Sequence, residues 1–514
     1  MDYTCFLWML LVGASSYLTI SHAQHEDIPY QDVQKICESC TCLTAQDADK
    51  RYHHMLSCVM KKFEHILARW PEEFGKNHNG VYIVASFSGN HINLLQQLPA
   101  TNASLTFSCR HCGIKDLQTP TFMDVPNIKS LDLSWNELPS NVLTPDVFRG
   151  PYRTTHYEPI ALLVLNLSHN KLHSLDKKLF EHIPNLTELH LDHNKFSVLD
   201  SPTQLALATA SSLEVLDLSY TGLKTIPISI LKTLINLKEL NLSGNELKTV
   251  PEHLKFVGKN LEILNVAGNQ IERFTETSFW GLQSLRRLNI SDNNALTIIE
   301  NDTFTRLEAL QYLHCSHNSK LHTFSLDSLM HCSNLTELDI SYCDISSLML
   351  SMDLSFSTNN QTLALPWPQL HIFETVGNPW QCDCELLQIL EYAGAHHLHN
   401  VAETRCNTPY ILAGSRLSNL TADFICSLRL PNKFRIVEED PPRFLRKRYI
   451  ILTAITASVV IVLGLIIGFL VVCIRRRLKN DDYGVEPIRY TSVRSSNLSA
   501  FSHVNPANGS TSHA

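Results

Sequence analysis

The chain has 514 residues and a formal net charge of −8 at pH 7, so it is long enough for several domains and acidic overall. No stripe of clustered Lys and Arg runs through its long central region, which argues against bulk electrostatic binding of nucleic acid. The sequence also lacks the G-x-S-x-G, H-E-x-x-H and phosphate-loop motifs, so we expect no enzymatic activity and no cofactor. On sequence grounds we assign no catalytic and no metal-binding residue.

Residues 1–23 have the pattern of a secretion signal. Phe6–Ala14 is a short apolar run, and Ser21-His22-Ala23 offers the small residues of a cleavage site. Asp2 stands where such signals usually carry a basic residue, which weakens the cleavage prediction more than the targeting prediction. The 15 cysteines fit the oxidising compartment that a secretion signal implies.

Residues 24–60 contain four cysteines, at positions 37, 40, 42 and 58. Such a cluster can form disulfides that staple a small cap with little core of its own. Alternatively, it can hold zinc together with His53 or His54. In a secreted chain we favour the disulfides.

Residues 61–378 are organised around copies of the pattern L-x-x-L-x-L-x-x-N. The copy Leu237–Asn245 is followed by copies that start at Leu261 and Leu285, each 24 residues after the last. A fixed period of about 20–29 residues with this pattern is typical of leucine-rich repeats. The clear copies, within residues 128–378, are Ile128–Asn136, Leu162–Asn170, Leu186–Asn194, Leu213–Thr221, Leu237–Asn245, Leu261–Asn269, Leu285–Asn293, Leu310–Asn318, Leu335–Cys343 and Leu370–Asn378. Tyr82–Asn90 and Phe107–Cys112 are degenerate copies before them.

The L-x-L centre of each copy predicts a short strand, in which alternate residues face opposite sides. In the copy at Leu237, Leu240 and Leu242 turn inward. Asn241 turns toward the open face. The inward Asn245 can supply a donor and an acceptor to buried backbone groups, so stacked copies form an asparagine ladder. One copy cannot bury its leucines alone, so neighbours stack into a solenoid with a parallel sheet on its concave side.

Several positions depart from this regular spacing. Thr221 stands in the asparagine place. The steps from Ile128 to Leu162 and from Leu335 to Leu370 are 34 and 35 residues long, so about ten extra residues should loop out of each. Phenylalanines recur ten to twelve residues after the ladder, and we expect a second apolar spine formed by Phe122, Phe148, Phe180, Phe279 and Phe304.

Five cysteines lie within the repeats, namely Cys109, Cys112, Cys315, Cys332 and Cys343. All but Cys332 occupy inward places, so we interpret them as free buried thiols. Cys332 and Cys343 could instead bridge adjacent turns. Because the number is odd, at least one cysteine stays free or pairs between chains.

The repeats end in N-P-W-Q-C-D-C, residues 378–384, and Cys406 and Cys426 follow. Residues 379–426 closely resemble the C-terminal cysteine cap of extracellular leucine-rich repeat proteins, and residues 24–60 resemble their N-terminal cap. The architecture is similar to that of Toll-like receptor ectodomains and neuronal leucine-rich repeat adhesion proteins. The resemblance implies the disulfides Cys37–Cys42, Cys40–Cys58, Cys382–Cys406 and Cys384–Cys426.

A short histidine cluster, His396-His397-x-His399, lies within the C-terminal cap. Such a cluster can hold a metal ion. No acidic or cysteine partner of known geometry accompanies it, so we interpret it as part of a solvated helix.

The concave face is the candidate binding surface, because exposed aromatic side chains bury a large area at a small entropic cost. Rings gather at outward strand positions and at the place just before the ladder, in the first four turns and again near the last two. Ordinary variation along a solvated repeat surface is the alternative. The candidate residues are Trp135, His169, His190, His193, Tyr220, His314, His317 and Tyr342.

Sequons of the form N-x-S/T predict N-glycosylation. Nine of them lie in the predicted extracellular part: Asn102, Asn166, Asn185, Asn241, Asn289, Asn301, Asn334, Asn360 and Asn419. Asn166, Asn241 and Asn289 point from the predicted concave sheet, so a sugar there would block part of that face. Alternatively, these triplets belong to the repeat pattern and stay bare.

Residues 449–474 are apolar without a charged residue and long enough to cross a bilayer as one helix. Basic triplets flank both ends, so the signal peptide sets the orientation: residues 427–448 form an outer linker and residues 475–514 a disordered cytoplasmic tail. Gly464-x-x-x-Gly468 predicts a weak homodimer within one membrane. In the tail, Tyr490 and Val493 resemble both a tyrosine-based inhibitory motif and an endocytic signal.

The sequence therefore predicts an α/β solenoid, a leucine-rich repeat horseshoe with a parallel concave sheet and disulfide caps, plus one transmembrane helix. The signal peptide, the apolar segment 449–474 and the sequons predict a single-pass type I glycoprotein of the plasma membrane. The resemblance implies that it acts as a receptor or adhesion molecule that binds an extracellular protein. The alternative is an innate-immune recognition protein that acts with a co-receptor, because residues 475–514 are too short for a signalling domain of its own.

Overall fold

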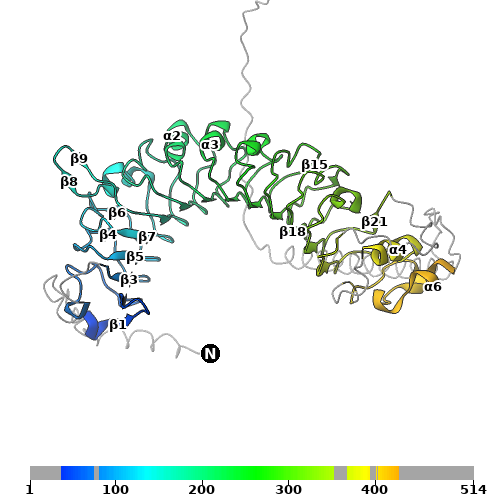
Figure 1. Ribbon diagram of the computed structural model, residues 1–514, viewed down its shortest axis with the longest axis horizontal. Coiled ribbons are helices and arrows are strands. Elements are labelled where there is room, and N and C mark those ends of the chain that lie inside the picture. Colours follow the sequence, from blue (N-terminus) through cyan, green and yellow to red (C-terminus); the bar gives the residue numbers. More distant parts are fainter. Residues whose placement is uncertain (1–35, 75–79, 352–366, 394–400, 402, 428–514) are drawn as a thin grey trace, which may run out of the picture. The chain divides into compact units, whose positions relative to one another are not determined.

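The computed structural model describes residues 36–74, 80–351, 367–393, 401 and 403–427 (Figure 1). The chain divides into two compact units, Met1–Leu430 and Pro431–Ala514, and every described residue belongs to the first. The predicted signal peptide, transmembrane helix, Gly464-x-x-x-Gly468 motif and tail motif at Tyr490 lie outside the described residues, as does His396-His397-x-His399. Within the described residues, no helix has the length and apolar character needed to cross a membrane.

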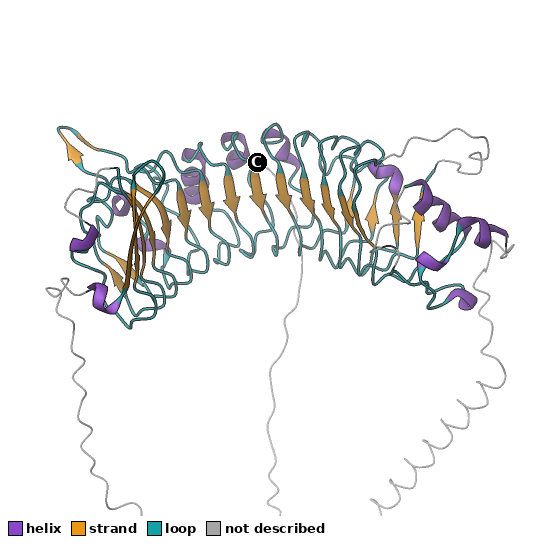
Figure 2. Cartoon of the chain, turned by 60° about the horizontal axis from the view of Figure 1, so that its bottom comes forward, coloured by secondary structure: helices purple, strands orange, loops and turns teal. Residues whose placement is uncertain are grey.

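A 14-stranded sheet runs along the first unit. Figure 2 shows its strands side by side along one face. Its first pair, β1 and β2, is antiparallel, and every later neighbouring pair is parallel. In order the strands are β1 (Thr41–Gln46), β2 (Tyr52–Ser57), β3 (Tyr82–Ser86), β5 (Ser104–Ser108), β7 (Ile128–Asp132), β10 (Val164–Asn166), β11 (Glu188–His190), β12 (Val215–Asp217), β13 (Glu239–Asn241), β14 (Ile263–Asn265), β16 (Arg287–Asn289), β18 (Tyr312–His314), β20 (Glu337–Asp339) and β22 (Ile372–Glu374). This sheet confirms the predicted solenoid.

The strand register follows the leucine pattern. Leu216, Leu240 and Leu264 lie opposite one another on three successive strands and are buried. Their strand neighbours Glu239 and Asn241 are half-buried on the open face. Alternate residues therefore separate into a core face and a solvent face, as a strand geometry requires.

Short helices and small sheets cover the other side of the repeats. Figure 1 shows α2 and α3 on the side away from the long sheet. The helices are α1 (Ile36–Ser39), α2 (Ser201–Thr209), α3 (Ile228–Thr233), α4 (Cys384–Tyr392) and α6 (Ala422–Ser427). The 3-10 helices are η2 (Glu72–Phe74), η3 (Ser140–Val142), η4 (Pro145–Phe148), η5 (Glu252–Phe256), η6 (Leu326–Leu329), η8 (Tyr410–Leu412) and η9 (Leu417–Asn419). The two-stranded sheets pair β4 (Leu94–Leu95) with β6 (Asp116–Leu117), β8 (Tyr152–Arg153) with β9 (His156–Tyr157), β15 (Arg273–Phe274) with β17 (Ile298–Ile299), and β19 (Thr323–Ser325) with β21 (Ser347–Met349).

The predicted phenylalanine spine is buried. Phe122 and Phe148 stack with ring centroids 5.7 Å apart, and Phe279 and Phe304 stack at 5.8 Å. Phe180 is also buried. These rings fill the space behind the leucines, so each repeat has two apolar layers.

The asparagine ladder holds the turns that follow the strands. Asn245 Nδ2 donates to the carbonyl oxygens of Leu218 and Leu242, both at 2.9 Å. Its Oδ1 accepts from Leu223 N at 2.9 Å. At the departure from the pattern, the Thr221 hydroxyl donates to Leu218 O at 2.7 Å. A smaller polar group therefore satisfies part of the same network.

The ladder extends into the degenerate repeats. Asn90 Nδ2 donates to the carbonyl oxygens of Cys58 and Phe87 at 2.8 and 2.6 Å, so Tyr82–Asn90 is a repeat as predicted. In the next turn the Cys112 thiol donates to Phe87 O at 3.2 Å. All five cysteines within the repeats are free and buried, so the alternative bridge between Cys332 and Cys343 is wrong.

The first long spacing produces a hairpin. Strands β8 and β9 pair antiparallel, with Tyr152 opposite Tyr157, and project from the repeats in Figure 1. This agrees with the predicted loop between Ile128 and Leu162. The second predicted loop, between Leu335 and Leu370, falls largely on residues 352–366, outside the described part of the chain.

Four disulfides join the cap cysteines in the pairs that the resemblance implies: Cys37–Cys42, Cys40–Cys58, Cys382–Cys406 and Cys384–Cys426. The zinc alternative in residues 24–60 is therefore wrong, because its thiols are used in disulfides. At the other end, Trp380 is buried and its indole nitrogen donates to Thr375 O at 2.8 Å. The cap thus closes the exposed cross-section of the last repeat.

Candidate functional site

The residue just before each ladder position lies in a left-handed turn. Trp135 has φ 59°, His169 51°, His193 54° and Tyr220 53°. This conformation is unfavourable for residues with a Cβ and favours glycine, which occupies the equivalent place in other turns, as at Gly244 (φ 65°). The sequence therefore carries large rings where glycine would fit with less strain.

Successive rings at these places stack into one continuous row, which we call the N-terminal ring stack. It consists of His111, Trp135, His169, His193 and Tyr220. Centroids of neighbouring rings are 4.8, 3.5, 3.9 and 4.5 Å apart in chain order. Because consecutive repeats place the rings at the same position, the row continues over five turns. Trp135 is 42% exposed and Tyr220 56% exposed.

A second row, the C-terminal ring pair, consists of His317 and Tyr342, with ring centroids 4.8 Å apart and an interplanar angle of 2°. Both rows end on a glycine. A Cβ at Gly244 would overlap the ring of Tyr220, and one at Gly377 would press against the ring of Tyr342. Each glycine therefore leaves room for the last ring of a row to lie flat on the next turn.

Substituting Gly244 by alanine is expected to lower the free energy of unfolding by about 2–5 kcal/mol. The left-handed φ costs about 1–2 kcal/mol, and displacing the Tyr220 ring adds about 1–3 kcal/mol. Gly414→Ala is the control, because Gly414 has φ 81° but nothing within 4 Å of its added Cβ. Chemical denaturation of the secreted ectodomain compares the two. Equal losses would show that Tyr220 does not rest on Gly244.

The structure separates the eight predicted ring residues into two groups. His190 and His314 lie on strands β11 and β18, on the open face of the sheet. The other six lie in the turns that follow the carboxyl ends of the strands. They therefore line the side of the sheet along which its strands end, which we call the edge of the sheet, and not its open face. The reason is the left-handed turn, which directs these side chains away from the strand direction. His111 belongs to the same row, although the sequence analysis did not include it.

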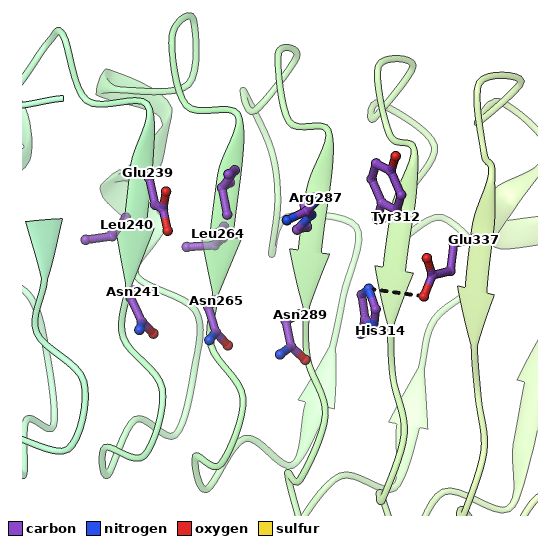
Figure 3. Close-up of a pocket in the computed structure, with 11 residues that line it drawn as sticks. Glu239, Leu240, Asn241, Leu264, Asn265, Arg287, Asn289, Tyr312, His314 and Glu337 are labelled. Atoms are coloured by element: carbon purple, nitrogen blue, oxygen red, sulfur yellow. Dashed lines mark ion pairs between the residues drawn. The ribbon is translucent and has the colours of Figure 1, made fainter. Parts of the chain in front are cut away.

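The open face of the sheet contains a hollow of about 520 Å³ (Figure 3). The guanidinium carbon of Arg287 lies 4.7 Å from the Tyr312 ring centroid. His314 Nε2 lies 3.7 Å from Glu337 Oε1. The hollow is thus polar and carries both signs of charge, which suits a polar segment of a protein ligand. Its lining residues are Glu239, Leu240, Asn241, Ile263, Leu264, Asn265, Arg287, Asn289, Tyr312, His314 and Glu337.

The leucine-rich repeat family model matches residues 157–196, 211–255, 251–294 and 284–345. These segments contain the strands from β10 to β20 and the ladder positions that follow them. Residues 157–196 and 211–345 are therefore leucine-rich repeats. No curated protein matches the chain.

Two solved structures are similar to this chain: the mouse RP105/MD-1 complex and an octameric complex of latrophilin 3, Unc5D and FLRT2. The first match has 20% sequence identity, a TM-score of 0.44, and covers 66% of this chain and 62% of that chain. The second has 19% identity, a TM-score of 0.39, and covers 74% and 97%. This protein therefore spans less than two thirds of the first chain's length.

The predicted sequons differ in how exposed their asparagines are. Asn166, Asn241 and Asn289 are half-buried on the sheet, and the last two line the hollow. Their side chains are hydrogen-bonded, as in the contact of Asn241 Nδ2 with Asp217 Oδ2 at 2.9 Å. Asn102, Asn185, Asn301, Asn334 and Asn419 are exposed, and Asn360 lies outside the described residues. Glycosylation at all nine sequons stays a prediction.

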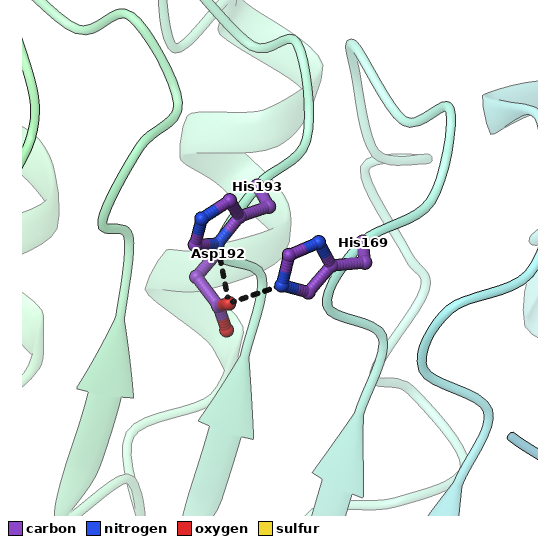
Figure 4. Close-up of side chains that lie close together, drawn as sticks. All are labelled: His169, Asp192 and His193. Atoms are coloured by element: carbon purple, nitrogen blue, oxygen red, sulfur yellow. Dashed lines mark hydrogen bonds and ion pairs between the residues drawn. The ribbon is translucent and has the colours of Figure 1, made fainter.

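Asp192 lies beside two titratable members of the N-terminal ring stack, His169 and His193 (Figure 4). His193 Nδ1 lies 2.9 Å and His169 Nε2 3.9 Å from Asp192 Oδ2. Burial, followed by the neighbouring His193, lowers the pKa of His169. The imidazole of His169 is therefore neutral at physiological pH and free to act as a hydrogen-bond partner or a ligand.

Proposed function

We propose that this chain is a single-pass surface glycoprotein whose repeat ectodomain binds an extracellular protein, as a receptor or adhesion molecule. The N-terminal ring stack is the observation that carries the proposal. Its five rings form an extended surface of flat, stiff side chains that are already held in place by one another. Such side chains lose little conformational entropy when a partner covers them.

Backbone strain supports a binding role for the ring stack. Repeat packing alone is served by glycine at this place, as Gly268 shows with φ 64°. Keeping Trp135 or His193 there costs about 1–2 kcal/mol each in backbone energy. Strained residues that neighbouring structure holds in place are typical of functional surfaces. The rings therefore suit contact with a partner better than they suit stability.

The partner class follows from the shape and chemistry of this edge. Stacked rings offer apolar area, while the carboxylate of Asp192 beside them offers hydrogen-bond acceptors. A protein surface with an apolar centre and a polar or basic rim matches this combination. We propose that the contact is made by the edge of the sheet, with the polar hollow on β13–β20 as a second contact.

The proposal is tested by a binding screen. The soluble ectodomain, residues 24–442, is presented as a multimer to a library of secreted and cell-surface proteins. The expected result is at least one specific partner whose binding is lost in Trp135→Ala. A library in which no protein binds above the level of an unrelated repeat ectodomain would contradict the proposal.

The proposed topology gives a separate prediction. If the sequons face the lumen and residues 449–474 cross the membrane, glycosidase treatment of protein from cells should increase its mobility on a gel. An epitope after Ala514 should stain only after permeabilisation, because the tail is cytoplasmic in this topology. Staining of that epitope on intact cells would contradict the type I orientation.

A further inference from the structure

We propose that His169, Asp192 and His193 form a binding site for a divalent transition-metal ion of the Zn²⁺ class, a site that the sequence analysis did not assign. This proposal is independent of the identity of any protein partner. Figure 4 shows the three side chains converging from two successive turns of the ring stack. Two imidazole nitrogens and one carboxylate oxygen are a ligand set that zinc takes in proteins.

Asp192 departs from the repeat pattern. The place two residues before the ladder asparagine carries serine in most turns: Ser134, Ser168, Ser219, Ser243, Ser291, Ser316 and Ser341. Asp192 brings a carboxylate to this place, and its side chain is only 16% exposed. Among the described residues, no Lys or Arg pairs with it; the side chains that face its carboxylate are the imidazoles of His169 and His193. A largely buried carboxylate that faces two imidazoles favours a cation between them.

The distances between the three ligand atoms are close to those around a single bound ion. The atoms all lie within 4.8 Å of one another, with separations of 2.9 and 3.9 Å from Asp192 Oδ2 to the two imidazole nitrogens. A tetrahedral ion with bonds of about 2.1 Å places its ligands about 3.4 Å apart. The observed separations lie on either side of this value. A rotation of one imidazole therefore brings all three atoms within bonding distance of one ion.

Further carboxylates make the surroundings attractive to a cation. His190, Asp192 and Asp217 form a second group whose ligand atoms also lie within 4.8 Å of one another. Glu188 Oε1 lies 2.7 Å from His190 Nε2. These acidic side chains concentrate negative charge beside the proposed site. Asp192 belongs to both groups, so it is the central residue.

Metal binding must disturb the ring stack. The rings of His169 and His193 lie 3.9 Å apart with an interplanar angle of 15°. A metal ion lies close to the plane of each imidazole that binds it, and nearly parallel stacked rings do not share such a position. One ring must therefore turn when the ion binds. Trp135 stacks on His169 with centroids 3.5 Å apart, so its fluorescence should report the change.

The test uses the full-length protein in detergent, titrated with Zn²⁺ alone. The wild type should bind a zinc ion with micromolar or tighter affinity, and the titration should change the tryptophan fluorescence. Asp192→Ser introduces the residue of the other turns, so it should fold normally while its affinity for this ion falls about tenfold or more. His169→Ala should lose the same binding event.

His317→Ala is the matched control, because His317 occupies the same place in a later turn and stacks on Tyr342. It should bind zinc as the wild type does. Trp135→Phe should retain zinc binding but lose the fluorescence change. Equal zinc stoichiometry and affinity in the wild type and Asp192→Ser would overturn the proposal, and so would an absence of binding to the wild type. Thermal melting in the presence of a chelator verifies that each variant is folded.

Discussion

Asn245→Leu is expected to lower the free energy of unfolding of the ectodomain by about 2–6 kcal/mol. Asn245 is only 5% exposed, and its amide bonds to backbone groups of two successive turns. Leucine has a similar size but leaves two buried donors, Thr221 N and Leu223 N, without their acceptor. Two carbonyl oxygens keep a second donor each: Leu218 O from the Thr221 hydroxyl, and Leu242 O from Asn269 Nδ2. Each buried group left unsatisfied costs about 1–3 kcal/mol. Chemical denaturation of the secreted ectodomain measures the loss.

Asn265→Leu provides the control for this prediction. Asn265 is one turn further along, half-buried on the open face of the sheet, and its Oδ1 accepts from Ala267 N at 3.1 Å. Its loss should cost about 1 kcal/mol, the contribution of one hydrogen bond. Similar losses for the two variants would show that the inward asparagines do not hold the turns together.

Removing the Cys384–Cys426 disulfide is expected to have the second large effect. It closes a loop with a sequence separation of 42 and ties α4 to α6. Cys384→Ser combined with Cys426→Ser should cost about 2–5 kcal/mol and lower the secreted yield. Without this link, the cap over the last repeat opens and exposes buried leucines such as Leu387.

The Cys37–Cys42 disulfide is the matched comparison, because its sequence separation is only 5. The entropy that a disulfide removes from the unfolded chain grows with loop length, so its loss should cost about 2 kcal/mol less than the loss of Cys384–Cys426. Thermal melting of both double serine variants under non-reducing conditions tests this order. The reverse order would show that strain or cap packing outweighs loop length.

The fold was largely predictable because one period controls both register and burial. Each repeat has two leucines that are two residues apart, such as Leu240 and Leu242, and these determine which face of the strand is buried. The ladder asparagine, such as Asn245, marks the turn that follows the strand. The degenerate repeat Tyr82–Asn90 was predictable from Asn90 alone, because its side chain makes the same hydrogen bonds to backbone carbonyl oxygens as the other ladder asparagines. The cap pairings came from resemblance, because cysteine spacing alone permits several connectivities.

The candidate site was predictable in its members but less so in its arrangement. Sequence periodicity placed Trp135 on the concave face, whereas a left-handed turn moves its ring to the edge of the sheet. His111 was missed because the candidate rings were taken from the clear copies alone, whereas His111 lies in the degenerate copy Phe107–Cys112. Asp192 was missed because a single acidic residue in a repeat looks like ordinary variation. Its departure from the serine of other turns was the available signal.

The most direct test of the central claim, that the edge bearing the N-terminal ring stack binds a protein, compares two tryptophans. Trp135 lies in the ring stack and is 42% exposed, whereas Trp280 is 48% exposed outside the stack, beside Lys255. The affinity of each alanine variant of the ectodomain is measured by surface plasmon resonance against a partner from the binding screen. The account predicts that Trp135→Ala weakens binding about tenfold or more, the loss of a central aromatic contact, and that Trp280→Ala leaves it unchanged. Unchanged affinity in Trp135→Ala, or a loss confined to Trp280→Ala, would contradict it.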